Sequence, residues 1–412
     1  MTTIPTAAPP TQSWKEIPRS VWALGFVSMF MDISSEMIHA LLPIYLVTVL
    51  GASMVTVGFI EGIAEATAMI TKVFSGGISD WLGKRKLLAV IGYGLAAFTK
   101  PVFPLAGSVG WIVAARFIDR IGKGIRGAPR DALVADITPE HVRGASFGMR
   151  QSLDTIGAFV GPLLAIGLML LTANSFTTVF WIAVIPAFIA VALMVYGVEE
   201  PAKKAAPENA RTPAKHRLQW SDAKQFSVFW SVVAVASVFT LARFSEAFLI
   251  LKAQAVGVPI AWVPIVMVVM NVIYAFSAYP AGVLSDRLGR NGILFFGIAM
   301  LIVADVLLAF ATSAAAVMLG VVFWGLHMGL TQGLLATLVA DTAPEKLRGT
   351  AFGIFNLALG VAMLIASVIA GALWQGLGAK FTFLAGAAFT TIALLGTAVI
   401  RYRTATTTAK PS

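Results

Sequence analysis

Long apolar runs separated by short polar connections dominate the pattern of this sequence. Each run is about twenty residues or more, which is enough for a helix to cross the ~30 Å hydrocarbon layer of a bilayer. Long runs without strict apolar–polar alternation favour helices over a barrel. The pattern predicts twelve membrane helices, at residues 20–49, 53–79, 87–108, 110–136, 140–171, 177–198, 226–253, 259–285, 292–312, 314–341, 345–375 and 380–400.

A charged segment rich in alanine and proline, "VEEPAKKAAPENARTPAKHRLQWSDAK", separates the sixth predicted helix from the seventh. It lacks apolar periodicity, which is typical of a linker. The proline-containing N-terminus lacks the pattern of a cleaved signal peptide. We therefore expect an all-α membrane protein made of an N-terminal tail (1–19), a six-helix bundle (20–198), a linker (199–225), a second six-helix bundle (226–402) and a C-terminal tail (403–412).

The composition agrees with a membrane protein. Hydrophobic residues make up 58% of the 412 residues and charged residues 12%, with a mean hydropathy of +0.85. The net charge of +10 comes from Lys and Arg on alternate connections, so the positive-inside rule places both termini and the linker in the cytoplasm. This bias explains the basic charge without a nucleic-acid partner. We expect a monomer in a bacterial cytoplasmic (inner) membrane, and the absence of cysteine excludes disulfides and thiolate metal sites.

The two halves repeat each other. "GGISDWLGKRK" (76–86) reappears as "GVLSDRLGRNG" (282–292), and "VADITPEHVRGASFG" (134–148) reappears as "VADTAPEKLRGTAFG" (339–353). The spacing between the copies is about the same in both pairs, which indicates duplication of one six-helix unit with its topology kept. Parallel repeats of this kind surround a substrate path along the membrane normal.

These repeated loops resemble the major facilitator superfamily. The first copy matches the family's motif G-x-x-x-D-R/K-x-G-R/K-R/K apart from Trp81, and the second copy matches it apart from Asn291. Arg116 matches the basic residue of the fourth-helix motif, whereas Asp119 and Arg120 replace its usual Gln-Gly. "GAFVGP" (157–162) resembles the fifth-helix Gly-Pro motif of proton-driven antiporters. The resemblance implies twelve helices in two pseudo-symmetric bundles and transport by alternating access.

The repeated loops also predict a cytoplasmic latch that is made in one conformation and broken in another. Carboxylates at cytoplasmic helix ends can accept hydrogen bonds from a neighbouring helix start, and Asp136 and Asp341 can pair with the loop arginines. The alternative is static anchoring of the topology by cytoplasmic charges. The latch residues are Gly76, Asp80, Gly83, Lys84, Arg85, Asp136, Arg143, Gly282, Asp286, Arg287, Gly289, Arg290, Asp341 and Arg348.

Ionisable residues also occur within the predicted membrane helices. In "FMDISSEMIHALLP" (30–43), Asp32, Glu36 and His39 share one side of a helix, and Asp32 lies roughly 18 Å into the membrane. An unpaired carboxylate at that depth costs about 2.5–3.5 kcal/mol, so this side must face partners or a wet cavity. The acids and bases of the first half are similar in number, which favours an internal ion-pair network over a purely anion-binding stripe.

The sequence predicts a proton-coupled transporter, with an exporter of a small amphipathic or charged compound as the leading hypothesis. We assign proton coupling to Asp32, Glu36, Glu61, Glu65, Asp119 and Asp154. Charge partners or substrate contacts are His39, Arg116, Arg120, Arg150, Arg243, Glu246, Asn271, His327, Gln332 and Asn356. The second half is poorer in charge, so we expect proton chemistry in the first half and substrate contacts shared with the more apolar second half.

Two alternatives remain open at this point. A divalent-metal exporter of ferroportin-like type would use Asp32, Glu36 and His39 as oxygen and nitrogen ligands. A non-transporting membrane sensor would need an output domain, for which the tails and linker are short. The chain has no Walker A motif and no hydrolase motif, so we expect no cofactor and no enzyme activity.

Overall fold

The computed structural model describes residues 16–200, 227–288, 290–342 and 348–408, and the regular structure in this part of the chain is helical. The first half contains α1 (Arg19–His39), α2 (Leu42–Thr48), α3 (Met54–Leu82), α4 (Arg85–Thr99), α5 (Val102–Leu105), α6 (Val109–Ile137), η2 (Glu140–Val142), α7 (Arg143–Leu171) and α8 (Phe176–Gly197). The second half contains α9 (Ser227–Ala242), α10 (Ala247–Ala255), η4 (Ile260–Trp262), α11 (Ile265–Leu288), α12 (Arg290–Phe310), α13 (Ala314–Thr342), α14 (Arg348–Leu377) and α15 (Ala379–Thr408).

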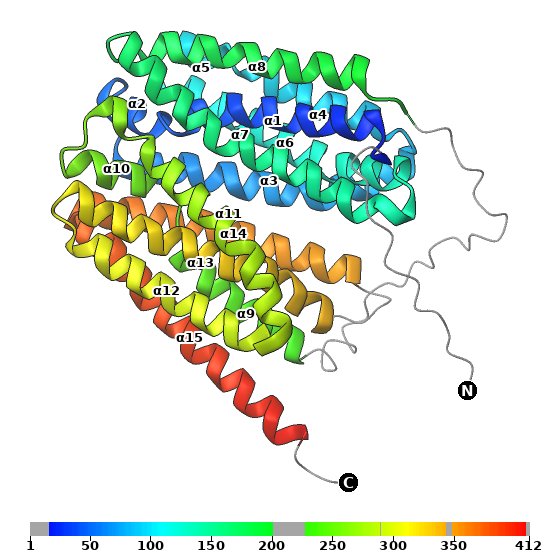
Figure 1. Ribbon diagram of the computed structural model, residues 1–412. Coiled ribbons are helices and arrows are strands. Elements are labelled where there is room, and N and C mark those ends of the chain that lie inside the picture. Colours follow the sequence, from blue (N-terminus) through cyan, green and yellow to red (C-terminus); the bar gives the residue numbers. More distant parts are fainter. Residues whose placement is uncertain (1–15, 201–226, 289, 343–347, 409–412) are drawn as a thin grey trace, which may run out of the picture.

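The helices form two groups that run side by side. Helices α1–α8 occupy the upper part of Figure 1 and α9–α15 the lower part. Between the groups, α3 packs along α14, α7 packs against α11, and the short helices α2 and α10 meet at the left end of the view. The interior between the groups is therefore bordered by α3, α7, α11 and α14.

Eleven helical segments of the described residues are long and apolar enough to cross a membrane. Helix α6 is equally long but is excluded from this set by composition, because it carries Arg116, Asp119, Arg120, Lys123 and Arg126. These residues are mostly buried inside the protein, so α6 spans the bundle with its charges turned inward. The twelve predicted helices therefore all appear as helical segments.

In the described residues, three of the predicted helices are each divided into two α-helices. The first breaks at Ala40–Leu41, ahead of Pro43, and the third breaks at Lys100–Pro101. Proline lacks a backbone N–H group and so favours such breaks. The seventh breaks between Ala242 and Ala247 without a proline, and serine side chains replace the lost contacts. The Ser245 N–H group donates to Ser367 Oγ at 3.2 Å, and the Ala247 N–H group donates to Ser245 Oγ at 3.2 Å.

Two glycines of the "GAFVGP" segment bring α7 into direct contact with α1. A Cβ atom on Gly157 would lie 2.5 Å from the Met29 carbonyl oxygen and 3.0 Å from Asp32 Cβ. One on Gly161 would lie 2.8 Å from Glu36 Cβ. Any larger side chain would push these helices apart. The glycines therefore position the side of α1 that carries the two predicted proton-coupling acids.

Other boundaries differ from the prediction. Helix α15 continues to Thr408, beyond the predicted boundary at residue 402, because the polar residues that follow the apolar run remain helical. Gly76 lies inside α3 rather than in a loop, and the turn between α3 and α4 is only Gly83 and Lys84. Gly83 adopts φ +59°, the left-handed conformation that glycine allows at a helix end. Gly282 likewise lies inside α11.

Candidate functional site

A cavity of about 290 Å³ lies between the two halves. Its first wall comes from α1, α3, α6 and α7, and its second wall comes from α11, α13, α14 and the break between α9 and α10. The first wall consists of Glu36, His39, Glu61, Glu65, Met69, Arg120, Lys123 and Ala158. The second wall consists of Arg243, Phe244, Ser245, Glu246, Met267, Met270, Asn271, Trp324, Met328 and Met363.

The centre of the first wall is a chain of ionisable groups on three helices. His39 Nδ1 lies 3.5 Å from Glu36 Oε2, and His39 Nε2 lies 3.3 Å from Glu61 Oε2. The same Glu61 oxygen accepts a hydrogen bond from Arg116 Nη2 at 2.7 Å. The Glu61 side chain is fully buried, whereas that of Glu36 is 20% exposed. Glu36 is therefore the most exposed of these groups at the cavity surface.

Two further pairs flank this chain. Arg120 Nη1 lies 3.1 Å from Glu65 Oε1 at the cavity surface. Behind the wall, Lys100 Nζ donates to Asp119 Oδ1 at 2.9 Å and to Ser35 Oγ at 3.0 Å. Lys100 is only 2% exposed, at the point where the third predicted helix breaks. Most charges of this half are thus paired inside the protein, as the balanced numbers of acids and bases predicted.

The second wall is mostly apolar. Met267, Met270, Met328 and Met363 line it together with Phe244 and Trp324. Its charged groups are Arg243 and Glu246, which the break between α9 and α10 carries into the cavity. Asn271 Nδ2 donates to the Ala158 carbonyl oxygen at 3.1 Å and so joins α11 to α7 at the cavity edge.

Asp32 lies one helical turn before Glu36 and does not line the cavity. Its Cβ packs near Gly157 of α7. In the part of the chain that the structure describes, no basic group lies within 4.0 Å of its carboxylate, although Lys123 and Arg126 are its nearest cationic neighbours in electrostatic terms. Asp32 therefore stands between the cavity charges and a second polar cluster.

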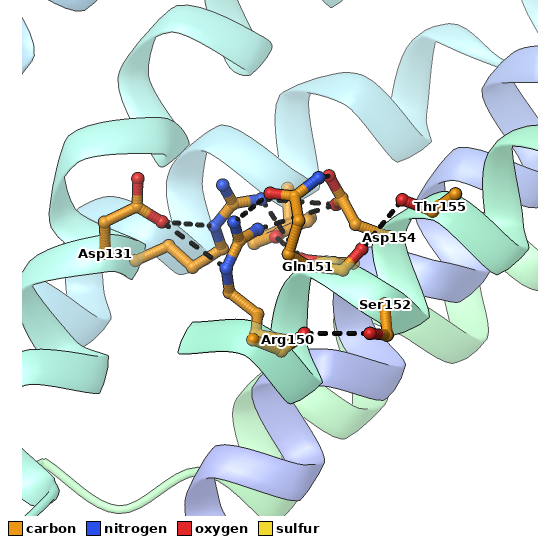
Figure 2. Close-up of polar contacts among 10 residues, drawn as sticks. Asp131, Arg150, Gln151, Ser152, Asp154 and Thr155 are labelled. Atoms are coloured by element: carbon orange, nitrogen blue, oxygen red, sulfur yellow. Dashed lines mark hydrogen bonds and ion pairs between the residues drawn. The ribbon is translucent and has the colours of Figure 1, made fainter. Parts of the chain in front are cut away.

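That second cluster joins α1, α6 and α7 (Figure 2). Arg150 lies between two acids in Figure 2, with Nε 3.8 Å from Asp131 Oδ1 and Nη1 3.7 Å from Asp154 Oδ1. Arg130 reaches the same acids at 3.1 and 3.7 Å and also donates to Ser28 Oγ at 3.1 Å. The cluster lies on the side of Asp32 away from His39, toward the beginning of α1.

One contact of the predicted latch is present in the described residues. Arg85 Nη1 lies 2.5 Å from Asp136 Oδ2 and donates to the Ala132 carbonyl oxygen at 3.0 Å, which joins the start of α4 to the end of α6. Lys84 and Arg143 are exposed and form no ion pair with a described residue, because each lies at an outward-facing helix start. Gly289 lies outside the described residues, as do the side chains of Asp80, Asp286, Arg287, Arg290, Gln332, Asp341 and Arg348.

Several predicted site residues lie away from the cavity. Arg116 and Asp119 stand behind its wall, and Arg150 and Asp154 belong to the cluster of Figure 2. His327 is fully buried between the rings of Phe239 and Trp324. Asn356 donates to the Phe352 carbonyl oxygen of its own helix at 2.9 Å. Helical periodicity predicts on which side of its own helix a residue lies. It does not predict which neighbouring helix that side contacts.

The metal alternative finds no matching arrangement among the described residues. No group of three or more His, Asp or Glu side chains there has the spacing to hold a metal ion. Both ring nitrogens of His39 already face carboxylate oxygens.

Comparison with known proteins agrees with this architecture. The sequence model of the Major Facilitator Superfamily matches residues 24–358 and 247–412 of this chain. An uncharacterized MFS-type transporter of Methanocaldococcus jannaschii is 32% identical over 384 residues, covering 90% of this chain and 92% of the relative. The cis,cis-muconate transport protein of Acinetobacter baylyi is 25% identical and covers 89% of this chain and 92% of the relative.

The fold is also found among solved structures. A bacterial homolog of the human lysosomal transporter Spinster, solved in an inward-facing and unoccupied conformation, has a TM-score of 0.73 at 15% identity. That similarity covers 94% of this chain and 97% of the solved one. With two helical groups around a polar cavity and matches along nearly its whole length, the chain belongs to the Major Facilitator Superfamily and is a membrane transporter rather than an enzyme.

Proposed function

We propose that this transporter couples the movement of a small amphipathic or charged compound to protons, and that it works as an exporter by antiport. The observation that carries the proposal is the chain Glu36–His39–Glu61–Arg116, which runs from the cavity surface to a fully buried carboxylate. Intramembrane ionisable groups that line a cavity are functional by default. The chain lies where a bound compound and a bound proton would influence each other.

The geometry supports a simple coupling mechanism. A proton on Glu36 neutralises its charge and removes its attraction to a protonated His39. His39 can then be held by Glu61 alone, which Arg116 already anchors. A conformational change that alters these separations also changes the proton affinity of the carboxylates. Binding of the compound and release of the proton thereby become linked.

We propose that the helix interruptions act as the hinges of the conformational change. His39 is the last residue of α1, and Glu246 directly precedes α10, so charged groups of both halves sit at helix interruptions. The segments beyond these breaks, α2 and α10, pack against each other at one end of the two helical groups (Figure 1). By the positive-inside rule this is the extracellular end. We place the protein in a bacterial inner membrane, as a monomer, with both termini in the cytoplasm.

The proposal of export is based on the segment of α7 that packs against α1. The "GAFVGP" segment that resembles the motif of antiporters packs its two glycines against the acidic side of α1. The name of the Acinetobacter baylyi relative keeps small organic acids among the candidate substrates.

Purified protein tests the proposal. A thermal-shift screen across organic anions, organic cations and divalent metals identifies the compound that stabilises the protein most. Flux of that compound in proteoliposomes is then measured with and without an imposed pH gradient. We expect gradient-dependent flux that is lost in Glu36→Gln and Asp32→Asn while substrate exchange at equal pH persists. Gradient-dependent flux retained by both variants would refute the assignment of coupling.

A further inference from the structure

Some of the charged residues that line the cavity form no ion pair, and their charges do not sum to zero. Glu61 is matched by Arg116, Glu65 by Arg120, and Glu36 by His39 when the ring is protonated. The remaining charged lining residues are Lys123, Arg243 and Glu246. With His39 protonated, two bases and one acid leave a net charge of +1 on the lining residues that form no ion pair.

Neither of the remaining bases forms an ion pair with a described acid, although Lys123 lies within electrostatic range of Asp32 and Glu36. Within the described ranges, neither Lys123 nor Arg243 has a carboxylate within 4.0 Å of its nitrogens, and Arg243 instead lies with its guanidinium carbon 5.9 Å from the centre of the Phe239 ring. Lys123 belongs to α6 and Arg243 to the break after α9, so they approach the cavity from opposite walls. Such cations are costly in a membrane interior unless water or an anion meets them.

Glu246 does not offset both of them. It stands directly before the first residue of α10, where the positive end of a nine-residue helix favours a carboxylate. Its side chain forms no capping hydrogen bond there, and one carboxylate cannot neutralise two bases. The positive groups are thus the ones still available to a ligand.

The rest of the second wall is suited to an apolar body. Four methionines, Phe244 and Trp324 face the same cavity, and methionine adapts its shape to varied ligands. A cavity of about 290 Å³ is at the lower end of the range for small-molecule sites.

We propose that the transported compound is a small organic acid whose carboxylate binds between Lys123 and Arg243 and whose apolar body packs on the methionine-rich wall. This inference rests on the proposed function only in taking the cavity as the transport site. A carboxylate accepts hydrogen bonds from a lysine and from an arginine in charge-assisted geometry. An amine of the same shape would meet two like charges.

A matched set of three probes tests the charge preference without any variant. The probes are 4-phenylbutyrate, its amide and 4-phenylbutylamine, which share one apolar body and carry a negative charge, no charge and a positive charge. Binding to the purified full-length protein is measured by isothermal titration calorimetry at pH 7. We expect the carboxylate to bind at least ~10-fold more tightly than the amide, the amount that charge-assisted hydrogen bonds supply. Equal binding of carboxylate and amide, or tighter binding of the amine, would overturn the proposal.

Variants then locate the site. Lys123→Gln and Arg243→Gln are each expected to weaken carboxylate binding by ~10-fold or more and to leave amide binding unchanged. Lys123→Arg keeps the charge and should retain binding, whereas Glu246→Gln removes a repulsive charge and should strengthen it. Carboxylate binding that is unaffected by both Gln variants overturns the site. Because binding is measured without a pH gradient, the proton-coupling assignment can fail while this result stands, and the reverse also holds.

Discussion

Replacing Glu61 by Gln tests whether the buried part of the charge network holds the fold together. Glu61 is 1% exposed and its Oε2 serves both Arg116 and His39. Glutamine keeps the size of the side chain but leaves Arg116, which is 2% exposed, without a counter-ion. Removing one member of a buried ion pair costs about 3–5 kcal/mol, because the other charge remains buried and unmet.

The free energy of unfolding is measured by SDS titration of the detergent-solubilised protein, followed by circular dichroism. We expect Glu61→Gln to lower it by about 3–5 kcal/mol. Glu36→Gln is the matched control: its side chain is partly exposed to the cavity, so water can replace the lost contact and the loss should be about 1 kcal/mol or less. The double variant Glu61→Gln/Arg116→Gln should recover most of the stability, since neither buried charge is then left alone. A Glu61→Gln protein as stable as the wild type, or a double variant no more stable than the single one, would refute this reasoning.

Three further predictions use other parts of the structure. Gly157→Val should separate α1 from α7 and abolish flux in proteoliposomes. Gly148 has open space around it, so Gly148→Ala should leave flux unchanged. Equal flux from both variants would contradict the proposed helix contact. Lys100→Met should destabilise the protein by about 3–5 kcal/mol in the same SDS titration, and Lys100→Met/Asp119→Leu should be more stable than the single variant. Asp136→Asn should change the free energy of unfolding by about 1 kcal/mol or less, because the pair of Asp136 with Arg85 is partly exposed. The same variant should lower the turnover rate more than the substrate affinity. Weaker binding with normal turnover would contradict a latch role.

Much of the architecture is predictable from the sequence because membrane helices leave a strong signal. Twenty-residue apolar runs have few alternatives in a bilayer, and the duplicated loops indicate how the halves relate. The presence of an internal ion-pair network also follows from the sequence, since acids and bases of similar number must meet inside the protein. Helical periodicity alone places Asp32, Glu36 and His39 on one side of α1, and of these Glu36 and His39 line the cavity.

The positions of individual partners were not predictable in the same way. Lys100 gave no signal as a site residue because it sits at a helix break beside Pro101, and only the fold brings it to Asp119 on α6. The break before α10 contains neither proline nor glycine, so the entry of Arg243 and Glu246 into the cavity depends on Ser245 and on Ser367 of a distant helix. Likewise, His327 and Asn356 are polar residues in apolar helices, but their contacts lie away from the cavity.

Coupling through Glu36 requires that the substrate drives proton movement across the membrane. Proteoliposomes containing a trapped pH-sensitive dye are given the compound selected in the thermal-shift screen, with no initial pH gradient. We expect the wild-type protein to move protons opposite to the compound, and we expect Glu36→Gln to exchange the compound across the membrane without any proton movement. Proton movement of wild-type size in Glu36→Gln would exclude Glu36 as the coupling group.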